Sequence, residues 1–202
     1  MNTNFSRFVP IICTLSILTL FAVAVDPLPQ VEGPGDAMAR MFKLGEKLAT
    51  PNENHAFLKK FAGSWTTHSS FMKLPFEKGS ATHEMILGER FLDGSYEGSF
   101  AGVQFSGRML IGYDNYKHKF VVTFIDSLGT SMRHAEGLLD RTGMVLSLWG
   151  TMDEWMTDEH DKPVLYRFSF VDEDHFVLEV HDLGIAGGDS LVIEVKYDRT
   201  MQ

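Results

Sequence analysis

Cysteine is nearly absent from this chain of 202 residues, and the single one, Cys13, lies inside an apolar run near the amino terminus. One cysteine cannot form an intramolecular disulfide, a zinc site built from several thiolates or a four-cysteine iron–sulfur cluster. Its position within the run, and not at the end of it, does not fit a lipoprotein signal. The chain is nevertheless long enough to bury an ordinary core without such cross-links.

Basic residues are also few: 18 Lys and Arg stand against 27 Asp and Glu, which gives a formal net charge of -9 at pH 7. Nucleic-acid phosphates and anionic lipid surfaces are bound through clustered Lys and Arg. The sequence has no such basic run. We therefore expect neither nucleic acid nor an anionic membrane surface as a partner.

Catalytic and metal-binding motifs are missing as well. The sequence has no Gly-x-Ser-x-Gly elbow, no phosphate-binding loop and no glycine-rich dinucleotide fingerprint. The acidic stretch 153–161 lacks the alternating Asp and Asn spacing of a calcium loop. We therefore predict no catalytic residue, no metal ligand and no cofactor, and calcium is disfavoured.

Eight histidines raise the separate question of a metal or a haem. No two of them show the i, i+4 spacing of a helical zinc site. Four lie in different predicted strands, so that only the fold could bring them together: His68, His83, His134 and His181. Single histidines in strands usually serve local hydrogen bonds, and haem is therefore disfavoured too.

The first 24 residues resemble a secretory signal peptide. Arg7 supplies the positive charge, residues 9–21 are almost unbroken apolar sequence, and Ala22-Val23-Ala24 has the small-x-small pattern of a cleavage site. We expect an exported, periplasmic or extracellular protein without a membrane span after cleavage. The alternative is an uncleaved anchor, since the apolar run approaches the roughly 18 residues that can span a bilayer.

The mature chain divides into a tether, a helical segment and one β domain. Residues 25–35 are rich in Pro and Gly and predict a tether. Helical spacing of apolar residues predicts helices within 36–61, the second of which should begin with a capping box formed by Thr50 and Glu53. The β domain should occupy residues 62–200.

From Gly63 onward the apolar residues alternate with a period of two, which predicts strands. Turn residues, among them Pro75 and the segment Asp161-Lys162-Pro163, separate about ten strands. These are 63–73, 79–88, 90–99, 103–113, 118–126, 130–139, 143–152, 163–171, 175–183 and 189–199. A meander of this length most simply closes into an antiparallel barrel with room for one small ligand, and a sandwich is the alternative.

Short segments in a fixed order carry a resemblance to a known family. They are Gly63-Ser64-Trp65, Ile86-Leu87-Gly88-Glu89-Arg90-Phe91-Leu92, Tyr96-Glu97-Gly98, Phe105-Ser106-Gly107, Gly112-Tyr113-Asp114-Asn115, Phe124-Ile125-Asp126-Ser127, Glu136-Gly137 and Tyr197-Asp198-Arg199. Over about residues 55–200 the chain resembles the uncharacterised family called domain of unknown function 1579 (DUF1579). The resemblance implies a lipocalin-like, or calycin-like, β-barrel and no established reaction.

The Gly-x-Trp segment and the final arginine are also similar to the wider lipocalin-like group. In that group the tryptophan closes the base of the barrel and the arginine lies over its ring. The resemblance therefore implies a structural contact between Trp65 and Arg199 that closes the barrel.

Asp126 and Arg133 flank a short turn at Leu128-Gly129. A two-residue hairpin there would place Phe124 opposite Arg133, and Asp126 diagonally beside Arg133 on the same face. If that face is the lumen, Arg133 could bind the carboxylate or phosphate of an amphipathic ligand while Asp126 holds it. The alternative is an ordinary ion pair on the outer surface.

Four further residues of the strand pattern are candidates for the apolar lining of a ligand cavity: Met85, Phe105, Met109 and Phe124. Methionine adapts to irregular apolar contacts, although plain core packing would explain the same residues. The sequence thus favours a binding protein for a small apolar or amphipathic molecule. The alternatives are a hydrolase or isomerase acting in the same cavity and an envelope interaction module whose barrel is filled by its own side chains.

Overall fold

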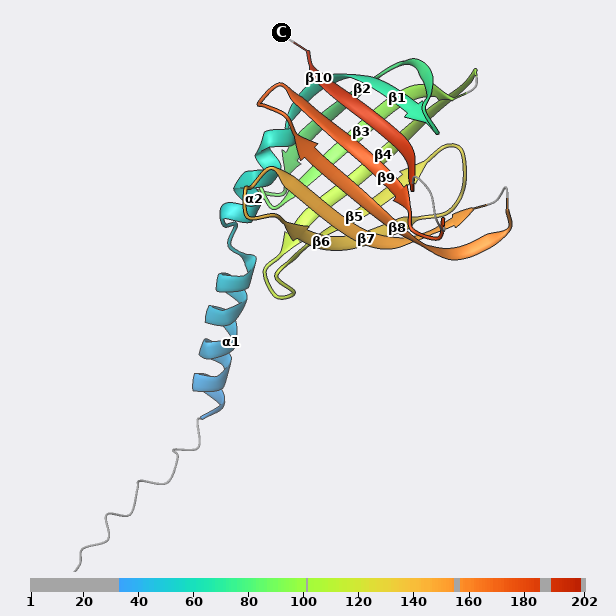
Figure 1. Ribbon diagram of the computed structural model, residues 1–202. Helices are drawn as coiled ribbons and strands as arrows, with labels where there is room; N and C mark the ends of the chain where they lie inside the picture. Colours follow the sequence, from blue (N-terminus) through green and yellow to red (C-terminus); the bar gives the residue numbers. More distant parts are fainter. Residues whose placement is uncertain (1–32, 101, 155–156, 186–189, 201–202) are drawn as a thin grey trace, which may run out of the picture. The chain divides into compact units, whose positions relative to one another are not determined.

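The computed structural model describes residues 33–100, 102–154, 157–185 and 190–200 (Figure 1). The expected signal peptide and residues 25–32 of the expected tether lie outside the described residues. The chain divides into two parts, residues 1–41 and 42–202, which are considered separately. No helix of the described chain is long and apolar enough to cross a membrane.

Ten antiparallel strands form a closed barrel in which sequence neighbours pair and β1 pairs with β10 (Figure 1). A closed sheet leaves no edge strand exposed. The predicted ten-stranded barrel is therefore confirmed, and the sandwich alternative is wrong. The strands are β1 (Gly63–Phe71), β2 (Leu74–Ile86), β3 (Phe91–Phe100), β4 (Val103–Asp114), β5 (Lys119–Asp126), β6 (Arg133–Leu139), β7 (Val145–Glu154), β8 (Glu159–Phe170), β9 (His175–Asp182) and β10 (Leu191–Arg199).

The core lies inside the barrel because buried and partly exposed residues alternate along the strands. In β5, Phe120, Val122 and Phe124 are buried and the residues between them are more exposed. In β8, Val164 and Tyr166 show the same alternation. Successive side chains of a strand point to opposite faces, so the buried set of each strand points into the lumen.

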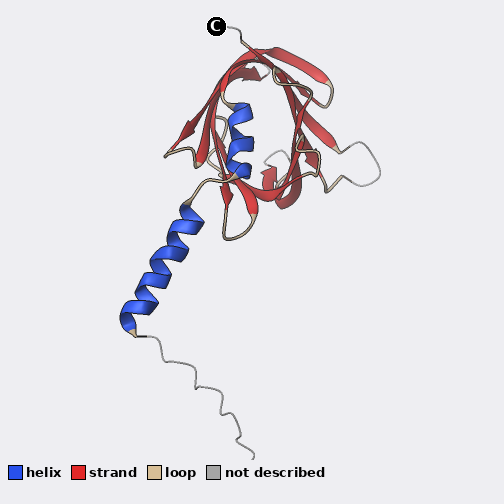
Figure 2. Ribbon diagram, turned by 90° about the vertical axis from the view of Figure 1, so that its left-hand side faces the viewer, coloured by secondary structure: helices blue, strands red, loops and turns tan. Residues whose placement is uncertain are grey.

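Short helical segments fill one end of the barrel, here called the helix end (Figure 2). α1 (Pro34–Ala49) buries none of its residues, whereas α2 (Glu53–Leu58) and the 3-10 turn η1 (Lys59–Phe61) bury Phe57, Leu58 and Phe61. The Phe61 ring lies 5.1 Å from the Phe176 ring and 5.5 Å from the Phe168 ring, centroid to centroid. The opposite end, formed by the β1–β2, β3–β4, β5–β6, β7–β8 and β9–β10 connections, is called the loop end.

Trp65 and Arg199 are in contact at the helix end, as the lipocalin-like resemblance implies. The guanidinium carbon of Arg199 lies 4.1 Å from the centroid of the Trp65 ring. Trp65 Nε1 donates a hydrogen bond to the Phe61 carbonyl at 2.8 Å. Arg199 donates to the carbonyls of Ala62 at 2.7 Å and Glu173 at 2.9 Å. The arginine thus ties the start of β1 to the β8–β9 turn.

The starts of the helices differ from those expected. α1 begins at Pro34, two residues before the predicted start at residue 36. The capping box of α2 consists of Asn52 and His55, and not of Thr50 and Glu53. The backbone N–H of Asn52 donates to Nδ1 of His55 at 3.1 Å. A neutral imidazole accepts this bond as a Glu carboxylate would, which the expected Ser/Thr-x-x-Glu pattern does not capture.

Two prolines expected in turns lie inside strands: Pro75 in β2 and Pro163 in β8. At both positions the strand has a partner on one side only. The β2–β3 pairing begins at Ser80, and the β8–β9 pairing begins at Val164. Proline lacks an N–H and is tolerated in a strand where no second partner needs that donor. Both strands therefore begin earlier than predicted.

Candidate ligand-binding site

Asp126 and Arg133 form an ion pair on the inner face of the barrel at the loop end. Asp126 ends β5 and Arg133 begins β6, and each continues the inward-facing positions of its strand, which include Phe124 and Ala135. Their side chains are 15% and 29% exposed, respectively. The pair therefore faces the lumen and not the outer surface.

The turn between these two residues is longer than predicted. Residues 127–132 connect the strands, in place of a two-residue hairpin centred on Leu128. The register of Phe124 opposite Arg133 is nevertheless as predicted. The Asp126 carboxylate accepts a hydrogen bond from the Leu128 N–H at 3.0 Å, so it closes the turn and holds the arginine at once.

Not every N–H donor of the Arg133 guanidinium has a hydrogen-bond acceptor in the described chain. Nη2 donates to the Asp126 carboxylate, but Nε is buried and has no hydrogen-bond partner in the described chain. Burial lowers the pKa of Arg133, yet the hydrogen bond and charge of Asp126 outweigh it, so that the pKa is raised overall. Arg133 is thus a permanent cation with an unused donor inside the barrel.

Tyr96 on β3 and Tyr166 on β8 contribute hydroxyl groups to the same region. Burial raises the pKa of Tyr96 to about 12 and also raises that of Tyr166, and the charges of Arg133 and Asp126 act on both. Tyr96 Oη donates to the backbone carbonyl of residue 125 at 3.2 Å. Both phenols therefore stay neutral near pH 7 and offer hydrogen bonds without charge.

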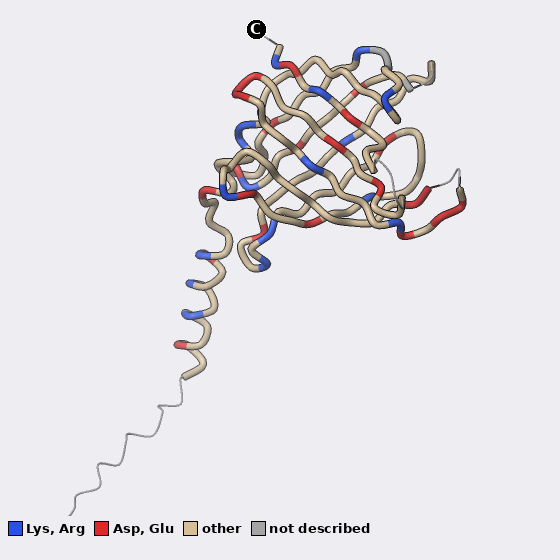
Figure 3. Tube along the Cα trace, viewed as in Figure 1, with Lys and Arg blue, Asp and Glu red and all other residues tan. Residues whose placement is uncertain are grey.

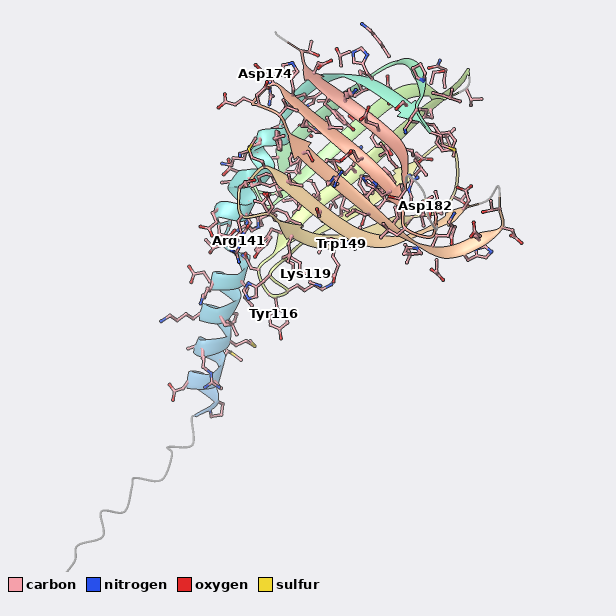
Figure 4. All side chains as sticks on the ribbon, in the orientation of Figure 1. Tyr116, Lys119, Arg141, Trp149, Asp174 and Asp182 are labelled. Atoms are coloured by element: carbon pink, nitrogen blue, oxygen red, sulfur yellow. The ribbon has the colours of Figure 1, made fainter. Side chains whose placement is uncertain are left out.

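A second ion pair lies at the loop end, between Lys162 of β8 and Asp182 of β9. Nζ of Lys162 lies 2.6 Å from Asp182 Oδ2 and 3.0 Å from a Glu159 oxygen, and the Lys162 and Asp182 side chains are 12% and 9% exposed. Figure 4 shows Asp182 far from Arg141, which belongs to the helix end. Acidic residues line the neighbouring β7–β8 hairpin (Figure 3).

The structure brings together five of the six predicted ligand-binding residues. Phe105, Met109, Phe124, Asp126 and Arg133 occupy inward-facing positions of β4, β5 and β6. Met85 does not join them, because it pairs with Leu92 near the helix end of β2 and β3. Whether any of the six binds a ligand stays a prediction.

Aromatic rings fill the helix-end half of the lumen. The ring of Phe176 stacks on Tyr197 with centroids 4.0 Å apart, and it meets the edge of Trp65 at 4.7 Å. Phe57 packs against Phe120 at 5.7 Å. The partly exposed inward-facing side chains, among them Phe105 and Arg133, lie in the other half, toward the loop end.

The four strand histidines do not meet. His83 is buried and faces inward, whereas His134 lies on the outside of β6 with Nδ1 2.9 Å from Thr123 Oγ1. His68 lies 3.3 Å from the Asp198 carboxylate, and His181 lies 3.1 Å from a serine hydroxyl. Among the described residues no group of three or more His, Cys, Asp or Glu is placed to hold a metal ion.

A family model described as "Protein of unknown function (DUF1579)" matches residues 50–199. The chain belongs to this family. The matched region spans α2, η1 and all ten strands. Membership agrees with the resemblance seen in the sequence and with the barrel, and it assigns no reaction.

Solved structures resemble this DUF1579 member in fold. The crystal structure of Rv2717c from M. tuberculosis is 14% identical with a TM-score of 0.54, over 75% of this chain and 100% of that chain. A redesigned β-barrel is 9% identical with a TM-score of 0.40, over 71% of this chain and 95% of that chain. At 14% identity the likeness to Rv2717c concerns the fold alone. No functionally curated protein matches the chain.

Sequence reasoning missed three residues of the DUF1579 loop-end region: Tyr96, Tyr166 and Lys162. The signal for Tyr166 and Lys162 was the alternation along β8, where Lys162, Val164 and Tyr166 fall on one face. It was hidden because the segment around Pro163 has the composition of a turn. For Tyr96 the signal was Gly107, which leaves room on β4 for the ring to cross.

Proposed function

We propose that the protein binds a small amphipathic molecule in the loop-end half of its barrel. The carboxylate or phosphate of the ligand would contact Arg133, and its apolar part would lie against Phe105, Met109 and Phe124. The observation that carries the proposal is the buried Nε of Arg133, which donates to no group of the described chain. A buried donor without an acceptor costs about 1–3 kcal/mol, which a ligand oxygen would recover.

The surroundings of Arg133 support an amphipathic ligand in preference to a purely polar one. The ring of Phe124 lies 4.8 Å from that of Tyr166, and both are buried. Met109 is buried on the neighbouring strand, and Phe105 lies 6.2 Å from Tyr96. Pockets that combine apolar walls with a few fixed polar groups are typical of small-molecule sites.

The same groups favour binding over acid–base catalysis. Arginine keeps its proton in proteins, and burial keeps the Tyr96 and Tyr166 phenols protonated at neutral pH. The carboxylate of Asp126 is engaged by Arg133 and by the turn. A filled barrel that acts only through its surface is the second candidate, and the packed rings of the helix end favour it.

The proposal includes export to the periplasm or the cell exterior. It rests on the apolar run at 9–21 and on the small residues Ala22 and Ala24 that follow it. The mass of the protein recovered from its own cells tests this part. A mature chain that starts at Val25 supports cleavage, and an intact amino terminus contradicts it.

Native mass spectrometry of gently purified protein is the first test of binding. An additional mass that is lost on denaturation would show a resident ligand and allow its identification. Calorimetric titration with decanoate, and with decanol as the uncharged analogue, then tests the role of Arg133. We expect decanoate to bind more tightly than decanol.

The variant Arg133→Met should remove this preference. Arg108→Met is the matched control, because Arg108 pairs with Asp93 across β3 and β4 but its side chain is 60% exposed on the outside. An Arg133→Met protein that is folded and binds decanoate as the control does would contradict the proposal. A wild-type protein that binds neither compound and carries no extra mass would favour the filled barrel.

A further inference from the structure

We infer that a groove on the outer wall of the barrel, independent of the loop-end site, binds an apolar organic anion through Arg90. The groove has a volume of about 480 Å³ and lies over β4 and β5 toward the helix end. Its walls include Arg90, Phe91, Leu110 and Val121. This volume lies within the range of small-molecule sites.

One wall of the groove is held in place by side-chain hydrogen bonds. Asn115 Nδ2 donates to the carbonyls of Leu48 at 2.8 Å and Thr50 at 2.9 Å, and its Oδ1 accepts from Asn52 Nδ2 at 2.7 Å. Arg90 Nε donates to the Ala49 carbonyl at 2.9 Å. Residues 48–52, the last two of α1 and the three that follow, are therefore fixed to the barrel beside the groove, and the groove is preformed.

A strained turn positions Arg90. Leu87, Gly88 and Glu89 have φ angles of 52°, 68° and 63°, so three successive residues adopt the left-handed conformation. Non-glycine residues pay for this conformation, and such strain is often kept where function requires it. Nη1 of Arg90 donates back to the carbonyls of Leu87 at 3.1 Å and Gly88 at 3.2 Å. The turn thus holds the guanidinium rigidly at the groove.

The charge of Arg90 is not neutralised by a carboxylate in the described chain. Its hydrogen bonds go to three carbonyls, and the neighbouring Glu89 pairs instead with Lys59 at 2.6 Å. Four other arginines each pair with a carboxylate: Arg108, Arg133, Arg167 and Arg199. The hydrogen bonds of Arg90 use its Nε and Nη1, which leaves the two N–H groups of its Nη2 for a ligand oxygen.

The floor of the groove is apolar. Leu110 is 45% exposed although it lies in the middle of β4. A side chain at Gly112 would come within 2.6 Å of the Phe91 ring, so the glycine lets this ring lie flat along the wall. A cation beside an apolar floor matches an aromatic or short aliphatic carboxylate or sulfonate. The alternative to ligand binding is a purely structural role, in which Arg90 only connects the end of α1 to the β2–β3 turn.

Titration with anilinonaphthalene sulfonate, followed by fluorescence and by amide chemical shifts, distinguishes the two. We expect saturable binding, with the largest shifts at Arg90, Leu110 and Val121. Leu110→Glu places a negative charge on the floor and should weaken binding about tenfold or more. Leu138→Glu is the control, because Leu138 is 54% exposed on β6 and does not line the groove.

A charge-matched pair completes the test. Arg90→Gln should weaken binding by a similar factor, whereas Arg141→Gln removes an exposed arginine from the β6–β7 turn and should not. If Arg90→Gln does not fold, the Leu110→Glu result decides alone. Shifts confined to the loop end, equal binding by the Leu110→Glu and Leu138→Glu variants, or no binding by the wild-type protein would each overturn the inference. Shifts confined to the loop end would place the probe at the Arg133 site, whereas the other outcomes have no bearing on decanoate binding there.

Discussion

Nδ1 of His83 donates a hydrogen bond to the carbonyl oxygen of Phe61 at 3.2 Å, and this bond links β2 to the turn that fills the helix end. His83 is buried beside the rings of Phe176 and Tyr197. Burial lowers the pKa of His83 to about 4, although the bond to the Phe61 carbonyl acts in the opposite direction. The histidine is therefore a neutral part of the core at physiological pH.

This relationship predicts a loss of stability in mild acid. Below pH 6.5 the unfolded chain protonates His83 while the folded chain does not, so unfolding becomes more favourable until the pH falls through about 4. The full effect is about 3 kcal/mol. Urea unfolding of the wild type and of His83→Leu between pH 7 and pH 4 measures it, since the other titrating groups are common to both proteins. Parallel pH profiles would contradict the buried neutral state.

The contact of Arg199 with Trp65 predicts that the guanidinium of Arg199 stabilises the closed barrel. Arg199→Met removes the hydrogen bonds to the carbonyls of Ala62 and Glu173 and the cation over the ring, and should cost about 3 kcal/mol. Arg167→Met is the control, because Arg167 pairs with Glu179 at a half-exposed position and should cost less than about 1 kcal/mol. Equal midpoints of chemical unfolding would show that Arg199 does not close the barrel.

The position of Tyr96 predicts that Gly107 cannot carry a side chain. A Cβ at Gly107 would overlap the Tyr96 ring, which crosses β4 to reach the carbonyl of residue 125 on β5. Gly107→Ala should therefore displace Tyr96 and cost about 1–3 kcal/mol. Gly129→Ala, where a Cβ meets open space, should change stability by less than about 0.5 kcal/mol. Thermal unfolding of the two variants tests this, and similar midpoints would count against the placement of Tyr96.

The features that could be predicted from the sequence are those set by local pattern, namely the strands and the β5–β6 register. Alternation from Gly63 onward located the ten strands, and the short connection between β5 and β6 placed Phe124 opposite Arg133 even though the turn was longer than expected. Proline was wrongly taken as a turn residue where no second strand needs its backbone N–H, as at Pro163. Tyr96 and Tyr166 were not assigned to the site, because the strand pattern alone does not show that Tyr96 crosses β4 or that Tyr166 on β8 comes near Arg133 in the lumen.

The inward-facing pair of Asp126 and Arg133 and the outer pair of Asp93 and Arg108 allow one comparison within the same protein. Both are Arg–Asp pairs across neighbouring strands, but the arginine side chains are 29% and 60% exposed. Solvent screens the outer pair, so a double-mutant cycle to Ala should give a coupling below about 1 kcal/mol there. The inner pair should give about 2 kcal/mol, because fewer waters compete for Arg133.

Repeating the double-mutant cycle with a saturating ligand tests whether that ligand binds Arg133. An anionic ligand at this guanidinium shares it with Asp126, so decanoate should change the coupling of the inner pair and leave that of the outer pair unaltered. Chemical unfolding of the seven forms (the parent, four single variants and two double variants), with and without decanoate, measures both couplings. If decanoate raises the stability of every variant equally, the ligand binds elsewhere and Arg133 is only a structural ion pair.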